Sequence, residues 1–172
     1  MTTATPRPAA LPHTPLAPSP SVRTARPDDA TALAALSLPF VGSGALRERP
    51  LSLYAAHAAD FLVLEAPDGT LEGCVGMRAY PDGGDGVGPA GVVYNFCVAE
   101  HQQGSGAGAG LLRAVLAMAR AQSLDALFTA TTGGGGLFLR YGFTPTTARL
   151  APRSWAESLD PRRNARILVR TW

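Results

Sequence analysis

A glycine-rich loop in the middle of the chain has the composition of a phosphate-binding site. Residues 103–109 read QGSGAGA, and the apolar residues that follow recur three and four positions apart, which predicts an amphipathic helix. The first amides of a helix are unpaired and carry partial positive charge, and glycines let a ligand approach them closely. The pattern therefore predicts a pyrophosphate cradle. Its members are Gln103, Gly104, Ser105, Gly106, Ala107, Gly108 and Ala109.

Other interpretations of this loop fit the sequence less well. A Walker loop needs a lysine, and all 15 basic residues of the chain are arginines. A dinucleotide fingerprint would require an acidic residue at the end of the next strand, whereas Asp125 comes at the start of that strand. A flexible linker does not explain the apolar period of the following helix. A tight strand-to-helix turn without a ligand stays open as the alternative.

The loop and its surroundings resemble the GNAT superfamily of N-acetyltransferases. Residues 103–108 match its Q-x-x-G-x-G pattern, the strand FCV precedes them at the usual spacing, and Gly142-Phe143 matches the family's "GF". The resemblance implies acetyl-CoA as co-substrate, with no metal, and transfer of an acetyl group to an amine. It also implies that the pantetheine arm pairs with the strand that contains Phe96, Cys97 and Val98.

The catalytic acid and base stay unassigned at this stage. Many members of the superfamily carry a glutamate where this chain has Val92 and a tyrosine where it has Phe138. Acyl transfer to an amine nevertheless needs a route for the amine proton. The candidates that could act through water are Tyr94, Asn95, His101 or a backbone carbonyl.

Within the superfamily, the chain resembles amino-acid N-acetyltransferases of the N-acetylglutamate synthase type. The similar features are the segment LRER at 46–49, the threonine pair at 131–132 and the basic run RRNARILV at 162–169. The resemblance implies an amino-acid acceptor, with L-glutamate first and arginine biosynthesis as the context. Rigid bidentate donors suit its carboxylates, which makes Arg49 and Arg166 the candidate clamps and Asn95 a further substrate contact.

Three alternatives to this assignment stay open. Both arginines could be solvated surface charges, since arginine is the only strongly basic residue of the chain. The enzyme could detoxify an antibiotic or another toxic amine instead of acetylating an amino acid. The chain could also be a non-catalytic module that binds acyl-CoA, because the usual glutamate and tyrosine are missing.

The order of the predicted elements indicates a mixed α/β sheet, largely antiparallel, with flanking helices. A short strand at 22–25 precedes a helix that starts at Pro27, and a second short helix covers 51–59. The turn Pro67-Asp68-Gly69 predicts a hairpin, and residues 92–98 predict a third antiparallel strand. Beyond the central helix we expect a strand at 124–131, a brief helix before Gly142 and a final strand at 165–172.

Length and composition predict one domain at 21–172 behind a disordered, proline-rich tail at 1–20. A formal charge of +2 with scattered arginines argues against nucleic-acid binding, and no apolar run approaches the ~20 residues of a membrane span. Cys74 and Cys97 lie in apolar strands and are expected to be buried thiols, which fits the cytoplasm. A homodimer stays open.

Overall fold

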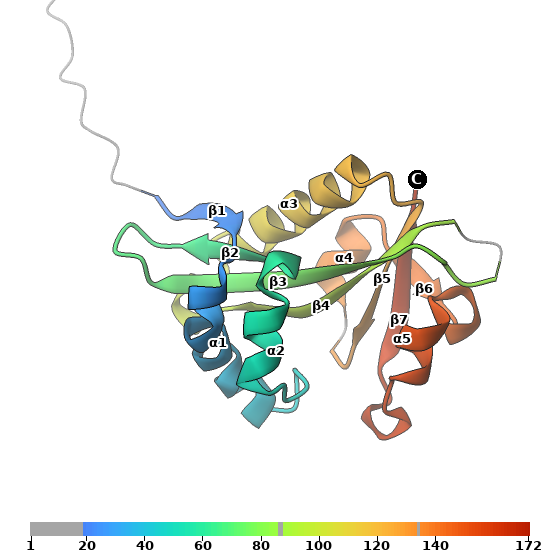
Figure 1. Ribbon diagram of the computed structural model, residues 1–172, viewed down its shortest axis with the longest axis horizontal. Helices are drawn as coiled ribbons and strands as arrows, with labels where there is room; N and C mark the ends of the chain where they lie inside the picture. Colours follow the sequence, from blue (N-terminus) through green and yellow to red (C-terminus); the bar gives the residue numbers. More distant parts are fainter. Residues whose placement is uncertain (1–18, 86–87, 134) are drawn as a thin grey trace, which may run out of the picture.

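A seven-stranded mixed sheet forms the centre of the computed structural model, which describes residues 19–85, 88–133 and 135–172 (Figure 1). The sheet order is β1-β2-β3-β4-β5-β7-β6, and every neighbouring pair is antiparallel except β4 and β5, which are parallel. This confirms the expected fold class. The strands are β1 (Ser21–Thr24), β2 (Phe61–Glu65), β3 (Leu71–Tyr80), β4 (Ala90–Val98), β5 (Ala126–Thr131), β6 (Thr144–Thr146) and β7 (Arg166–Thr171).

Helices cover both faces of this sheet (Figure 1). On one face lie α3 (Ala107–Ala121) and α4 (Gly136–Arg140). On the other lie α1 (Ala30–Gly42), α2 (Leu51–Ala56) and α5 (Arg153–Glu157). The predicted tail lies outside the described residues, apart from residues 19 and 20, which have no regular structure.

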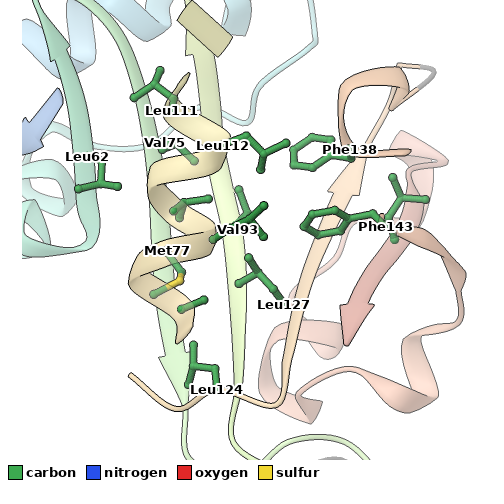
Figure 2. Packing of buried hydrophobic residues seen from close by; sticks show 14 of the residues in the cluster. Leu62, Val75, Met77, Val93, Leu111, Leu112, Leu124, Leu127, Phe138 and Phe143 are labelled. Atoms are coloured by element: carbon green, nitrogen blue, oxygen red, sulfur yellow. The ribbon is translucent and has the colours of Figure 1, made fainter. Parts of the chain in front are cut away.

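The amphipathic helix α3 supplies the largest part of the core. Leu111 and Leu112 on its inner face are fully buried and lie against Val75 and Val93 of the central strands (Figure 2). Phe138 of α4 closes the same cluster from the side of β5. Burying a leucine contributes about 1.5–3 kcal/mol, so this face fixes the helix, and with it the preceding loop, against the sheet.

Several helix boundaries differ from the sequence prediction. The segment at Pro27–Asp29 is a single 3-10 turn, and α1 starts only at Ala30 but then continues through Pro39. Phe40 packs against the core, which compensates for the hydrogen bond that a proline removes from a helix. The second helix ends at Ala56, and its predicted last residues form another 3-10 turn.

The two cysteines are buried free thiols, as predicted. Cys74 of β3 and Cys97 of β4 are register partners, and their Sγ atoms lie 3.6 Å apart. The contact with Cys74, together with burial, raises the pKa of the Cys97 thiol well above its usual range. The Cys97 thiol therefore stays protonated, and both buried side chains pack as small groups between the strands.

The described residues hold neither a metal-ligating cluster nor a membrane-spanning helix. Within residues 19–85, 88–133 and 135–172, no group of three or more His, Cys, Asp or Glu side chains could hold a metal ion. No helix in the same part of the chain has the length and apolar character that crossing a bilayer requires.

Candidate active site

Strands β4 and β5 separate halfway along β4. Their register runs from the pair Ala90–Ala126 to the pair Val93–Thr129, and β4 then continues to Val98 without a partner in β5. Parallel strands that part in this way leave backbone donors and acceptors unused on the facing edge. The unpaired stretch at 94–98 can therefore pair with an extended ligand.

A bulge in β4 lies at the same point. Cys74 pairs with Cys97 and Gly76 pairs with Tyr94, so β4 has one residue more than β3 in this interval. Asn95 within it has a φ of 49°, the left-handed region that asparagine tolerates better than other side chains. The bulge turns the end of β4 and redirects the side chain of Asn95.

The glycine loop borders a groove of about 610 Å³ that continues toward α4. Gly104 and Gly106 have φ values of 80° and 89°, and a Cβ at either position would have no heavy atom within 4 Å. The first helical hydrogen bond of α3 runs from Gly110 N to Gly106 O (2.9 Å), so the amides before it have no helical carbonyl partner. Amides at a helix N-terminus fit a pyrophosphate, and of these the Ala107 amide already donates to Ser105 Oγ.

Polar side chains of the loop brace it from within. The Nε2 of Gln103 donates to the carbonyl of Val98 at 3.1 Å, which ties the loop to the end of β4. The Ser105 hydroxyl donates to Gln102 O at 2.6 Å and accepts from Ala107 N at 3.3 Å. These two predicted ligand contacts thus shape the cradle through their side chains.

The predicted strand contacts differ in what they present. Phe96 packs edge-on against Phe138, with ring centroids 5.6 Å apart, and Cys97 points toward Cys74. Val98 borders the groove. Because its side chain faces Cys74, Cys97 can present only its backbone at the opening between β4 and β5.

A separate cavity, of about 370 Å³, lies where β4 and β5 separate, and we refer to it as the main cavity. Arg49 and Asn95 both line it, which brings two of the three predicted substrate contacts together. Its wall is built from β4, β5, α5, Ala148 and the segments at 45–49 and 159–165. Three arginines, Arg47, Arg49 and Arg163, line it together with one carboxylate, Asp160, so the lining carries a net positive charge.

Arg49 is held in this wall by neutral groups. Its Nη1 donates to Asn95 Oδ1 at 3.1 Å and to the carbonyl of Arg47 at 3.2 Å, and its guanidinium lies 5.2 Å from the Tyr94 ring centre. Burial lowers the pKa of Arg49 from its usual value. The side chain still remains a cation at neutral pH because arginine does not deprotonate in proteins.

Tyr94 separates the main cavity from a neighbouring one of about 380 Å³, because it borders both. Its hydroxyl donates to Asp60 Oδ2 at 2.9 Å, and Arg78 Nε donates to the same oxygen at 3.0 Å. Burial and the nearby Asp60 charge raise the pKa of Tyr94 well above its usual range. Its phenol stays protonated, so a Tyr94 phenolate is excluded as the general base.

Two residues singled out from the sequence lie elsewhere. His101 pairs with Glu72 at 3.1 Å beside the glycine loop and is not among the residues that line the main cavity. Arg166 begins β7 with an exposed side chain and is likewise not among them, although the preceding Ala165 is. The role of Arg166 in substrate binding stays a prediction.

Sequence reasoning missed the contribution of the segment between β6 and β7. Trp155 of α5 borders both cavities, and Asp160 and Arg163 line the main one. Asp160 accepts from Arg162, which lowers the pKa of the Asp160 carboxyl. This carboxylate is therefore a weak base, and the irregular loop that carries it has no periodic signal that could have identified it.

Comparison with known proteins gives a consistent family. The sequence profile of the acetyltransferase (GNAT) domain matches residues 57–145, just over half of the chain. An amino-acid acetyltransferase of Ralstonia nicotianae is 33% identical over 149 residues, which are 87% of this chain and 32% of that protein.

Two solved structures of N-acetylglutamate synthase from Neisseria gonorrhoeae are also similar. One, complexed with coenzyme A and N-acetyl-glutamate, has a TM-score of 0.79 at 28% identity and covers 88% of this chain and 35% of its own. The other, complexed with coenzyme A and L-arginine, has a TM-score of 0.74 at 27% identity, covering 90% and 34%. This chain thus spans about a third of the length of these relatives. The profile match, the fold and the glycine loop together show that the chain belongs to the acetyltransferase (GNAT) domain family.

Proposed function

We propose that the chain transfers the acetyl group of acetyl-CoA to the primary amine of a small amino acid, with L-glutamate as the first candidate. The observation that carries this proposal is the cavity at the opening between β4 and β5, which is lined by Arg47, Arg49 and Arg163. None of the three has an ion-pair partner within the described residues. Guanidinium groups that bond only to neutral acceptors keep their charge for the carboxylates of an amino acid.

The donor would lie along the groove and the unpaired edge of β4. The amides at the start of α3, opened by Gly104 and Gly106, would hold the pyrophosphate, and the backbone at 96–98 would pair with the pantetheine arm. When bound, acetyl-CoA supplies an activated acyl carbon. The main cavity borders β4 at residues 93–95 and the groove borders it at Val98, so the acceptor and the donor would both lie along the unpaired end of β4.

Positioning would then account for much of the catalysis. Arg49 and Arg163 would hold the acceptor carboxylates, which leaves the amine directed to the opening, and Trp155 would limit access of water. Correct orientation contributes up to about 7–11 kcal/mol in favourable cases. Val92 and Phe138 have no ionisable group that could accept or donate a proton. The amine proton would therefore pass to water held by the unpaired carbonyls of β4.

Release of free thiol from acetyl-CoA, measured with a panel of amino acids, amines and aminoglycosides, tests the proposal. We expect turnover with acidic amino acids. Replacement Arg49→Met should raise the acceptor KM about 10- to 100-fold, since hydrogen bonds to charged groups contribute about 1.5–3 kcal/mol. Arg166→Ala tests the other predicted clamp, and Arg26→Met, at an exposed position that lines neither cavity, is the matched control.

The same panel separates the alternatives. Preferential turnover of aminoglycosides or toxic amines would replace the amino-acid assignment with detoxification. Measurable binding of coenzyme A without thiol release with any acceptor would identify a non-catalytic acyl-CoA-binding module. An unchanged KM for every acidic amino acid in Arg166→Ala would remove Arg166 from the site.

A further inference from the structure

The side chain of Asn95 lines the main cavity and has hydrogen-bond partners on both its oxygen and its nitrogen. It is only 4% exposed, and its Oδ1 accepts from Arg49 Nη1 at 3.1 Å and from the buried Tyr54 hydroxyl at 3.3 Å. Its Nδ2 donates to Ser37 Oγ at 2.9 Å and lies 3.6 Å from Cys74 Sγ. Every polar atom of this amide therefore has a partner, as a buried polar group requires.

The surrounding groups allow only one orientation of the amide. The Ser37 hydroxyl donates to the carbonyl of Leu33 at 2.8 Å, and the Cys74 thiol donates to the backbone carbonyl of Asn95 at 3.4 Å. Both groups thus already donate their single proton elsewhere, so toward the side chain of Asn95 they can act only as acceptors. The NH₂ must face Ser37 and Cys74, which places the oxygen toward Arg49.

The chemical class of the partner at Arg49 is unusual. A partly buried guanidinium ordinarily has a carboxylate partner, because an unpaired charge is costly to desolvate. Here the described residues give Arg49 a neutral amide oxygen, a backbone carbonyl and the face of Tyr94. A neutral acceptor fixes the direction of the guanidinium but leaves its positive charge without compensation.

We infer that Asn95 is a positioning residue: its neutral amide orients Arg49 while keeping the full charge of Arg49 available to an anionic group of the acceptor. The inference rests on the proposed function and adds to it a requirement for neutrality at position 95. A carboxylate would make the same hydrogen bonds from the same backbone conformation, since aspartate also tolerates the left-handed region. It would, however, pair with Arg49 and compete with the acceptor.

The test compares two replacements that preserve the bulge. Asn95→Asp retains the oxygen but adds a negative charge, and Asn95→Gly retains the backbone but removes the side chain. With L-glutamate as acceptor, we expect Asn95→Asp to raise KM at least 10-fold and Asn95→Gly about 3- to 10-fold, corresponding to about 1.4 and 0.7–1.4 kcal/mol. The affinity for coenzyme A, measured by calorimetry, should stay within twofold in both variants and reports that they are folded.

A double-mutant cycle distinguishes positioning from a general structural effect. In an Arg49→Met background, Asn95→Asp should have no further effect on the KM for L-glutamate, because the group that it neutralises is gone. The matched control is Gln122→Glu, the same amide-to-carboxylate change at an exposed position at the end of α3 that lines neither the cavities nor the groove. Its KM should change less than threefold.

Each outcome decides between the two hypotheses. Additive effects of Arg49→Met and Asn95→Asp, or an equal effect of Gln122→Glu, would overturn the role of Asn95 while leaving the proposed function intact. An unchanged KM in Asn95→Asp would do the same. If none of the amino acids tested caused the wild-type chain to release thiol, the proposed function would be wrong. The role of Asn95 would then be wrong as well.

Discussion

Replacing Gly76 by alanine should damage the acceptor site through the ring of Tyr94. A Cβ added to Gly76 on β3 would lie 2.8 Å from Cε1 and Cζ of that ring and 3.1 Å from Cδ1. Ordinary carbon contacts are about 3.5–4.0 Å, so the ring would have to move away by roughly 0.7–1.2 Å. It cannot do so freely, because Phe61 packs on it at 5.2 Å and Asp60 accepts from its hydroxyl at 2.9 Å.

The expected cost is that of an overpacked core. Such insertions cost about 1–3 kcal/mol, and each kcal/mol lowers the Tm of a chain of this size by about 2–4 °C, which gives a decrease of about 2–12 °C. The displaced ring would also move Arg49, whose guanidinium stacks on it at 5.2 Å, so the acceptor KM should rise while the KM for acetyl-CoA stays unchanged.

Thermal unfolding followed by circular dichroism, together with steady-state kinetics, measures both effects. Gly110→Ala is the matched control, because the nearest atom to its Cβ is the flexible end of Arg113 at 3.9 Å, and it should stabilise α3 by up to about 1 kcal/mol. In a Tyr94→Ala background, Gly76→Ala should no longer destabilise. A Tm within 1 °C of wild type for Gly76→Ala alone, or the same loss with and without the ring, would refute the reasoning.

Three other predictions concern the glycine loop, the edge strand and the thiols. Gly106→Ala should cost about 1–2 kcal/mol because the φ of 89° suits only glycine, and calorimetry should show weaker binding of coenzyme A. The hydrogen bond from Arg23 lowers the pKa of Asp29, so Asp29→Asn should lower the free energy of unfolding by about 1–2 kcal/mol at pH 7. In urea titrations this difference from wild type should shrink as the pH falls below about 4 and disappear below the lowered pKa of Asp29, since Arg23 stabilises only the ionised carboxylate. Iodoacetamide should leave Cys74 and Cys97 unmodified in the native chain and label both in denaturant, as mass spectrometry would show. Rapid native labelling would contradict their burial.

Local signals in the sequence account for the donor side. The glycines at 104 and 106, the strand before them and the apolar period of α3 are contiguous in the chain, so the cradle could be predicted from residues 95–121 alone. The hairpin at Pro67-Asp68-Gly69 and the buried cysteines could likewise be predicted, because turn chemistry and apolar strands are short-range features.

The acceptor side depends on contacts between distant segments. Arg49, Asn95 and Arg163 belong to three parts of the chain that meet only when β4 and β5 separate and the loop after α5 folds against them. The exposed start of β7 illustrates the limit, because successive side chains of a strand alternate faces and the sequence does not specify which face Arg166 occupies. The sequence by itself determined the family and the fold class, and it predicted the glycine loop that we propose as the cradle for the donor. The tertiary structure alone decided which arginines line the cavity and that a neutral amide holds one of them, because hydrogen bonds across 46 residues of sequence have no local pattern.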